Sequence, residues 1–198
     1  MSKQTKDLET EEIIKSTAKH LFFVEGKFNA TTQEIADAAG VNRTLINYYF
    51  RSRDNLFNLI FEDAIKKEDE QREEILFSEL PFKEKIEAYI DKSFQLAKEF
   101  PYLETYIVSR INDGCFYKNE EDYNRFIKAF EKNFKEEVKK GNVEDIPPMQ
   151  FVINIASLVS FPFAVRPLLQ KSLRISDEQF EKLIQERKEV IMKMLFKK

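Results

Sequence analysis

Histidine, cysteine and glycine are scarce in this sequence. Its 198 residues include one histidine, one cysteine, four glycines and no tryptophan. The single cysteine, Cys115, excludes a disulfide within the chain and suits a reducing compartment. Nucleophilic catalysis needs a base beside serine or cysteine, and the only histidine, His20, lies within a helical pattern. No glycine-rich phosphate loop or metal-ligand cluster occurs. We therefore expect no enzyme, no metal and no cofactor.

The scarcity of glycine also bears on the fold class. Each of the four glycines separates two segments with apolar residues at helical spacing, and chains with many tight turns need more of them. Long Glu- and Lys-rich periodic stretches point the same way. The sequence therefore predicts an all-α protein of about nine helices, with no strand and no internal repeat.

Long hydrophobic runs and a strong net charge are absent too. The net charge is −3, and the most apolar run, residues 151–165, is interrupted by Asn154, Ser157 and Ser160. That run is shorter than the roughly 20 residues a spanning helix needs. The first residues, MSKQTKDLETEE, are polar and contain no apolar signal region. We expect a soluble cytoplasmic protein without a membrane partner.

The first third of the chain carries an ordered series of helix signals. Apolar spacing predicts a helix from about residue 10 to 25, which Gly26 can end. The segment TTQE, starting at Thr31, is a capping box in which Thr31 and Glu34 satisfy each other's backbone N–H groups. This box predicts a short helix over residues 32–39.

A second short helix follows a tight turn. Gly40 can supply the left-handed turn residue, and Asn42 can cap a helix over residues 43–50. Ser52 can cap a fourth helix, and the charged stretch 66–74 is interpreted as its solvated continuation. Two short helices joined by a glycine turn are typical of a helix-turn-helix.

The helix predicted over residues 43–50 has two different faces. Ile46 and Phe50 lie one turn apart and can face the preceding helices, whereas groove-compatible side chains lie outward. Arginine can bridge guanine, asparagine can bridge adenine, and threonine can contact a thymine methyl. No acidic residue occurs between Asp37 and Asp54. This pattern favours a DNA-facing surface over ordinary surface charge. The outward residues are Arg43, Thr44, Asn47 and Tyr48, joined by the first-turn amides of Thr31, Thr32 and Gln33 and by the cation of Arg53.

Taken in order, residues 10–57 resemble the DNA-binding domain of TetR-family transcriptional regulators. The resemblance implies that Arg43, Thr44 and Asn47 face bases and that Leu45 lies at the groove edge. It implies that the following residues face phosphates or sugars: Thr31, Thr32, Gln33, Tyr48, Tyr49 and Arg53. Asn47 stands where the family usually has tyrosine, and Thr44 where glycine is common, so the operator sequence does not carry over from a relative.

The rest of the chain fits the family's variable C-terminal domain in the number and order of its helices. We place a helix-turn-helix DNA-binding domain at residues 1–54 and a helical regulatory and dimerisation domain at residues 55–198. A helix over 149–170 is apolar nearly all round, and Pro162 should kink it. The resemblance implies a homodimer through the last two helices. Small polar residues along that helix either permit close helix approach, which we favour, or line a ligand cavity.

The aromatic content, 19 phenylalanines and seven tyrosines, can build a pocket or fill a core. The candidate ligand-binding residues are Phe94, Tyr106, Arg110, Phe130 and Asn154. We hypothesise a ligand-responsive homodimeric repressor that binds a pseudo-palindromic DNA operator and an unknown small-molecule effector. The alternative is a small-molecule-binding or scaffold protein that keeps the helix-turn-helix for packing.

Overall fold

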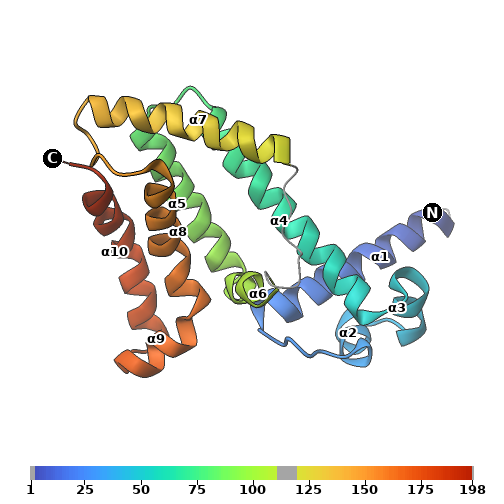
Figure 1. The fold of residues 1–198 in the computed structure, drawn as a ribbon. Helices are drawn as coiled ribbons and strands as arrows, with labels where there is room; N and C mark the ends of the chain where they lie inside the picture. Colours follow the sequence, from blue (N-terminus) through green and yellow to red (C-terminus); the bar gives the residue numbers. More distant parts are fainter. Residues whose placement is uncertain (1–2, 111–119, 198) are drawn as a thin grey trace. The chain divides into compact units, whose positions relative to one another are not determined.

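The protein is helical throughout the part that the structure describes. The computed structural model describes residues 3–110 and 120–197, and of residues 3–6, 110 and 120–123 only the backbone. No strand occurs in these ranges, so the predicted all-α fold is confirmed (Figure 1). The helices are α1 (Lys3–Lys19) with a π-helical turn (His20–Val24), α2 (Thr32–Ala39), α3 (Arg43–Phe50), α4 (Arg53–Phe77), α5 (Phe82–Glu99), α6 (Leu103–Arg110), α7 (Glu120–Lys139), α8 (Pro148–Ala164), α9 (Arg166–Leu173) and α10 (Asp177–Leu195).

The helix expected over residues 149–170 is two helices. α8 passes through Pro162, and the axes of α8 and α9 differ by 74°. The break lies just before Pro167, which has no N–H to donate to the Phe163 carbonyl. The N–H of Val165 donates to the Phe161 and Phe163 carbonyls instead. Because of this break, residues 3–110 and 120–197 contain ten α-helices, whereas the sequence predicted about nine.

The first helix also differs from expectation. α1 begins at Lys3 rather than near Thr10, because its polar first turns carry no apolar period that could mark them. At its other end a π-helical turn adds a residue to the helical repeat. The consequence is that three consecutive side chains, Leu21, Phe22 and Phe23, are all buried.

The chain divides into two compact units, which are described separately. The first comprises Met1–Glu68 together with Glu99–Leu103, and the second comprises Asp69–Lys98 with Glu104–Lys198. The core of the first unit is aromatic, with the Phe22 and Phe57 rings edge to face at 5.2 Å and the Phe57 and Phe61 rings stacked at 5.7 Å. Ile14, which is fully buried, adds to this core from α1.

The short segment Glu99–Leu103 completes the first unit. The backbone N–H of Tyr102 donates to the Phe23 carbonyl at 3.0 Å, and its ring meets Phe28 edge to face at 5.8 Å. Gly26 lies beneath the same ring at φ 65°, and a Cβ there would stand 2.9 Å from the tyrosine ring atoms. Gly26 is therefore required both by its backbone conformation and by the close approach of Tyr102.

The second unit is built around a cluster of phenylalanine rings. Phe134 and Phe151 lie 4.8 Å apart, and Phe130 stacks on Phe134 at 6.1 Å. Phe82 and Phe196 join the same cluster, so α5, α7 and α8 and the residue after α10 share one core. A smaller cluster consists of Ala97, Phe163 and Phe180.

Among the described residues no single helix has both the length and the apolar character needed to cross a membrane; only the bent pair α8 and α9 meets that test together.

Candidate functional site

The helix-turn-helix of the first unit is held by the caps that the sequence predicted. The Glu34 N–H donates to the Thr31 hydroxyl at 3.2 Å, and the Glu34 carboxylate accepts from the Thr31 N–H at 2.7 Å. These bonds from Thr31 lower the pKa of the Glu34 carboxyl below its ordinary value. The predicted capping box is thus confirmed, and α2 begins at Thr32 as expected.

The turn between α2 and α3 follows the same logic. Gly40 adopts φ 65° and its N–H donates to the Asp37 carbonyl at 3.2 Å, so the turn needs a left-handed residue there. The Asn42 side chain accepts from the Thr44 N–H at 2.9 Å and from the Thr44 hydroxyl at 2.7 Å. The predicted cap of α3 is therefore confirmed, and it fixes where α3 begins.

α3 presents the two faces that its spacing predicted. Ile46 is fully buried and Phe50 is 5% exposed, so both anchor the helix to the first unit. The outer face is solvent-exposed, and Tyr48 is 74% exposed, which is unusual for an aromatic ring. The exposed outer residues are Arg43, Thr44, Asn47 and Tyr48, whereas Leu45 and Tyr49 are half-buried.

One side-chain hydrogen bond joins the starts of α2 and α3. Arg43 Nε donates to the Thr32 hydroxyl at 3.0 Å. A guanidinium carries five N–H donors, so this bond positions Arg43 and leaves four donors for another partner. Thr31 and Gln33 are exposed beside Thr32. The first turns of both helices therefore present hydrogen-bonding groups on one surface.

Tyr49 is placed at the edge of this surface. Its hydroxyl donates to the Asp7 carboxylate at 3.4 Å, and its ring meets Tyr48 edge to face at 5.0 Å. Desolvation, with the Asp7 carboxylate adding to it, raises the pKa of the Tyr49 hydroxyl. Tyr49 therefore stays protonated at neutral pH and can donate a hydrogen bond.

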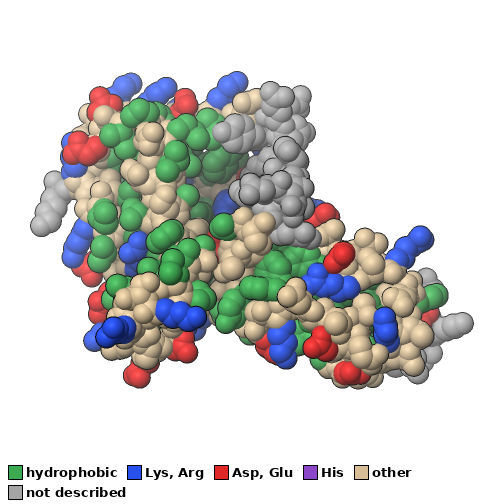
Figure 2. Space-filling view, turned by 60° about the horizontal axis from the view of Figure 1, so that its bottom comes forward, with side chains coloured by type: hydrophobic (Ala, Val, Ile, Leu, Met, Phe, Trp, Pro, Cys, Tyr) green, Lys and Arg blue, Asp and Glu red, His purple; other side chains and the backbone are tan. Residues whose placement is uncertain are grey.

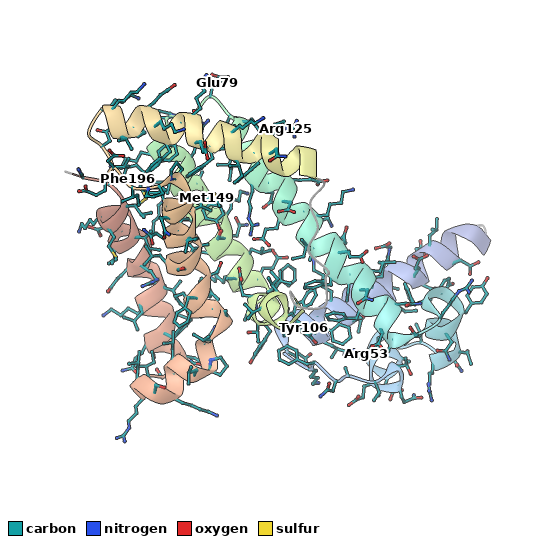
Figure 3. The ribbon with its side chains drawn as sticks, viewed as in Figure 1. Arg53, Glu79, Tyr106, Arg125, Met149 and Phe196 are labelled. Atoms are coloured by element: carbon teal, nitrogen blue, oxygen red, sulfur yellow. The ribbon has the colours of Figure 1, made fainter. Side chains whose placement is uncertain are left out.

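Arg53, at the first turn of α4, is tied into the unit in a way that the sequence did not indicate (Figure 3). Its guanidinium donates to the Phe28 and Ala30 carbonyls and to the Asp54 carboxylate. It also lies over the rings of Phe22 and Phe57, at 4.9 and 5.5 Å from their centroids. The side chain remains 26% exposed. Sequence reasoning assigned only its charge and missed this packing.

Arg51 is a second residue that sequence reasoning missed. It ends α3 at φ 66° and ψ −37°, and the Ser52 N–H donates to the Phe50 carbonyl at 2.8 Å across it. This is a γ-turn with positive φ, which is strained for a residue with a Cβ. The Arg51 side chain is exposed. A strained residue at the end of a surface helix is a candidate functional residue.

A cavity of about 260 Å³ lies in the second unit. Its walls come from α4, α5, α7 and α8, and most lining residues are apolar, including Ile75, Ile86, Phe126 and Ile155. Two basic side chains, Arg72 and Lys85, also line it. The position of Arg72 shows that the charged stretch of α4, interpreted from sequence as solvated, has one face turned inward.

Of the five candidate ligand residues, one lines this cavity. Phe130 does so, whereas Phe94 packs on Phe163 with ring centroids 5.5 Å apart. Tyr106 is 7% exposed and Asn154 is exposed on α8. The Arg110 side chain lies outside the described residues, as does Cys115. The structure therefore does not bring the five together.

The surface of α8, α9 and α10 is unusually apolar. Folded monomers rarely expose large contiguous hydrophobic patches. In Figure 2 hydrophobic side chains are visible over the face of the second unit that is turned to the viewer. Eight large apolar side chains on these helices are at least 39% exposed: Met149, Ile153, Phe161, Leu168, Leu173, Leu183, Val190 and Met194.

Comparisons with known proteins agree with the geometry of the first unit. Residues 14–60 match the family described as bacterial regulatory proteins, tetR family. No curated protein matches the sequence closely enough to count as a relative.

Three solved structures show the same fold over nearly the whole chain. A putative fatty acid metabolism regulator of Clostridium perfringens is 19% identical to this chain, with a TM-score of 0.60; the match covers 94% of this chain and 100% of that protein. A TetR/AcrR-family regulator of Thermobifida fusca is 15% identical, with a TM-score of 0.61; the match covers 93% of this chain and 97% of that protein. A ketosteroid transcriptional regulator of Mycobacterium tuberculosis is 13% identical with a TM-score of 0.69, covering 95% of each chain. At these identities the likeness establishes the fold alone.

Proposed function

We propose that this chain is a transcriptional regulator of the TetR family that represses transcription by binding a DNA operator as a homodimer; the match of residues 14–60 to that family supports the proposal. The observation that carries the proposal is the outer face of α3. Its exposed residues can form hydrogen bonds or apolar contacts with base edges, and its buried residues hold it against the unit. A helix-turn-helix kept only for packing would not need Tyr48 in solvent. As a regulator of transcription, the protein acts in the cytoplasm.

Direct reading of the operator falls to three residues of α3. Arg43 bridges guanine O6 and N7, Asn47 bridges adenine N6 and N7, and Thr44 contacts a thymine methyl. The bond from Arg43 Nε to Thr32 supports this role, because it fixes the guanidinium while leaving its terminal N–H groups available. Leu45, which is half-buried, lies at the groove edge.

Contacts to the DNA backbone surround these residues. Phosphates accept from side-chain hydroxyls, cations and the amides at helix starts. Arg53 contributes through the exposed part of its side chain, and Arg51 joins the set because its exposure and strained turn are otherwise unexplained. The proposed backbone-contacting residues are Thr31, Thr32, Gln33, Tyr48, Tyr49, Arg51 and Arg53.

The apolar surface of α8–α10 supports a homodimer through the last two helices of the chain. Burying that surface against a second copy would remove the exposed side chains from water. Two copies of α3 would then enter successive major grooves, with half-site centres about 34–36 Å apart. The operator is accordingly a pseudo-palindrome.

An effector that binds in the second unit would regulate this DNA binding. A ligand shifts an equilibrium between two conformations only by its difference in affinity for them. The cavity of the second unit supports the proposal because its walls are mostly apolar with a few polar groups.

Selective recovery of genomic fragments tests the proposed function. The ligand-free chain is mixed with fragments of its source genome at several salt concentrations, and the retained DNA is sequenced. We expect a small set of fragments that share a pseudo-palindromic site. Retention of all fragments alike at every salt concentration would contradict the proposal and favour a scaffold or small-molecule-binding protein.

A further inference from the structure

The cavity of the second unit combines an apolar wall with two basic side chains. Its lining includes Arg72 and Lys85, and no acidic side chain lines it among the described residues. Every other lining residue is apolar except Tyr89 and Ser160. A mostly apolar site whose charged side chains are all basic is suited to a ligand with an anionic head and an apolar body.

Lys85 carries most of this argument. It is only 9% exposed, and its ammonium donates to the Leu76 carbonyl at 2.7 Å. No carboxylate among the described residues lies within ion-pair distance of it. A buried ammonium has three donors, and burying a charge without a counter-charge is costly. An anion in the cavity would supply that counter-charge.

Arg72 shapes the same region of the wall. Its guanidinium lies 5.9 Å from the centroid of the Tyr89 ring, which also lines the cavity, and pairs with the Asp69 carboxylate at 3.4 Å. Arg72 therefore adds a second positive charge to the wall that Lys85 also lines.

The cavity volume limits the ligand. A cavity of about 150 Å³ is known to hold benzene, so 260 Å³ takes a molecule of about ten non-hydrogen atoms. That size matches a medium-chain or small aromatic carboxylate and is too small for a drug-sized molecule.

We propose that this cavity binds a small amphipathic carboxylate, with its head held by Lys85 and Arg72 and its apolar body against Ile86, Phe130 and Ile155. The assignment of that carboxylate as the effector rests on the proposed function, whereas its binding does not. The competing explanation is that Lys85 serves only to cap the C-terminal end of α4, where a cation is favourable.

Calorimetric titration of the full chain without DNA tests this proposal. The probes are octanoate, 1-octanol and octylamine, which share one apolar body and differ in the charge of the head. We expect octanoate to bind at least ten-fold more tightly than 1-octanol, and octylamine to bind most weakly. Equal affinity for octanoate and 1-octanol would overturn the proposal, and this result needs no variant.

Variants then locate the site. Lys85→Met keeps most of the side-chain length and removes the charge. It should lower octanoate affinity at least ten-fold while leaving the affinity for 1-octanol unchanged. Lys92→Met, an exposed lysine of the same helix, is the matched control and should bind octanoate as the original chain does. Ala156→Phe, which fills part of the cavity from an exposed position, should weaken both ligands.

The outcomes separate the explanations. If Lys85→Met lowers the thermal midpoint of the ligand-free chain but binds octanoate unchanged, Lys85 only caps α4 and the proposal is wrong. Fragment retention on the same preparation separates this inference from the proposed function. Octanoate binding without selective DNA retention would support the cavity assignment and overturn the proposed function. Selective DNA retention without octanoate binding would support the proposed function and overturn the cavity assignment.

Discussion

The two compact units of this protein use aromatic side chains for different purposes. In the first unit, Phe22, Phe57 and Phe61 pack edge to face or stacked, the Arg53 guanidinium lies over the Phe22 and Phe57 rings, and Tyr48 is left in solvent. In the second unit, phenylalanine rings surround a core next to a cavity, and large apolar side chains remain exposed. The first unit thus has a filled aromatic core that supports a surface of fixed polar groups. The second unit contains a cavity and an exposed apolar surface, both of which are suited to partners.

The largest expected effect tests whether the two cores are separate. Phe57→Ala should lower the free energy of unfolding by about 3–5 kcal/mol, because the buried ring leaves a cavity. Hydrogen exchange should show lost protection in the first unit. The control, Phe134→Ala, removes an equally buried ring from the second unit and should expose that unit instead. Equal loss of protection along the whole chain in both variants would contradict the two-core comparison.

Two glycine variants test whether Tyr102 constrains the first unit at Gly26. Gly26→Ala combines a left-handed backbone with a clash against the Tyr102 ring, and should cost about 2–4 kcal/mol in urea unfolding. Gly40→Ala has the same φ of 65° but no heavy atom within 4 Å of the added Cβ, and should cost about 1–2 kcal/mol. Equal costs would show that Tyr102 does not constrain Gly26.

Two arginine variants, one in each unit, test which unit binds DNA. Arg43→Ala should cost about 1–3 kcal/mol in binding of a selected operator and relax its sequence preference, because a bidentate contact to guanine is lost. Arg125→Ala, which removes an exposed arginine from α7 in the second unit, should leave affinity unchanged in the same mobility-shift titration. An unchanged preference in the Arg43 variant would count against its base-reading role.

Two residues with positive φ allow backbone strain and function to be separated. Arg51→Gly and Arg174→Gly each relieve a left-handed non-glycine residue, and each should raise the free energy of unfolding by about 1 kcal/mol or less. Only Arg51→Gly should weaken DNA binding. The dependence of its DNA affinity on salt concentration should become shallower by about the amount that one phosphate contact contributes. Unchanged DNA affinity in that variant would return Arg51 to a purely structural role.

The smallest effect concerns the capping boxes. The box of α2 uses Glu34, whereas that of α10 uses the neutral Gln179, which accepts from the Ser176 N–H at 2.8 Å. The folded pKa of Glu34 is lowered, so its stabilisation is full above the unfolded pKa and is lost as pH falls through the folded pKa. Glu34→Gln should therefore reduce the acid sensitivity of the first unit, and Gln179→Glu should introduce it at α10. Unchanged pH profiles of unfolding in both variants would contradict this account.

The sequence predicted the first unit well because its signals are local. Capping boxes, a glycine turn and an asparagine cap each lie within four residues of the group they satisfy, so α2 and α3 begin where expected. Helical spacing also separated Ile46 and Phe50 from the outer face of α3. The π-helical turn and the bonds of Arg53 to Phe28 and Ala30 were missed, because they depend on packing between segments more than 20 residues apart.

The second unit was predicted less completely. Periodicity shows which face of a helix is buried but not which helix covers it, so the aromatic stripe over α5–α8 did not reveal a cavity. Arg72 lies within a stretch of charged residues, so its sequence position does not distinguish it. Lys85 lies in the first turn of α5, where an exposed lysine would be equally ordinary. Only contacts across the unit distinguish these two basic residues from the many exposed ones.

The docking of Tyr102 on Gly26 affects how this domain could be exchanged between proteins. A DNA-binding unit that ended at Glu68 would lose the segment Glu99–Leu103, and with it the ring over Phe28 and the bond to the Phe23 carbonyl. A chimera that grafts only the first 68 residues onto another regulator must supply a matching aromatic residue from its own chain. Recombination in this protein is thus constrained by a residue outside the contiguous N-terminal segment.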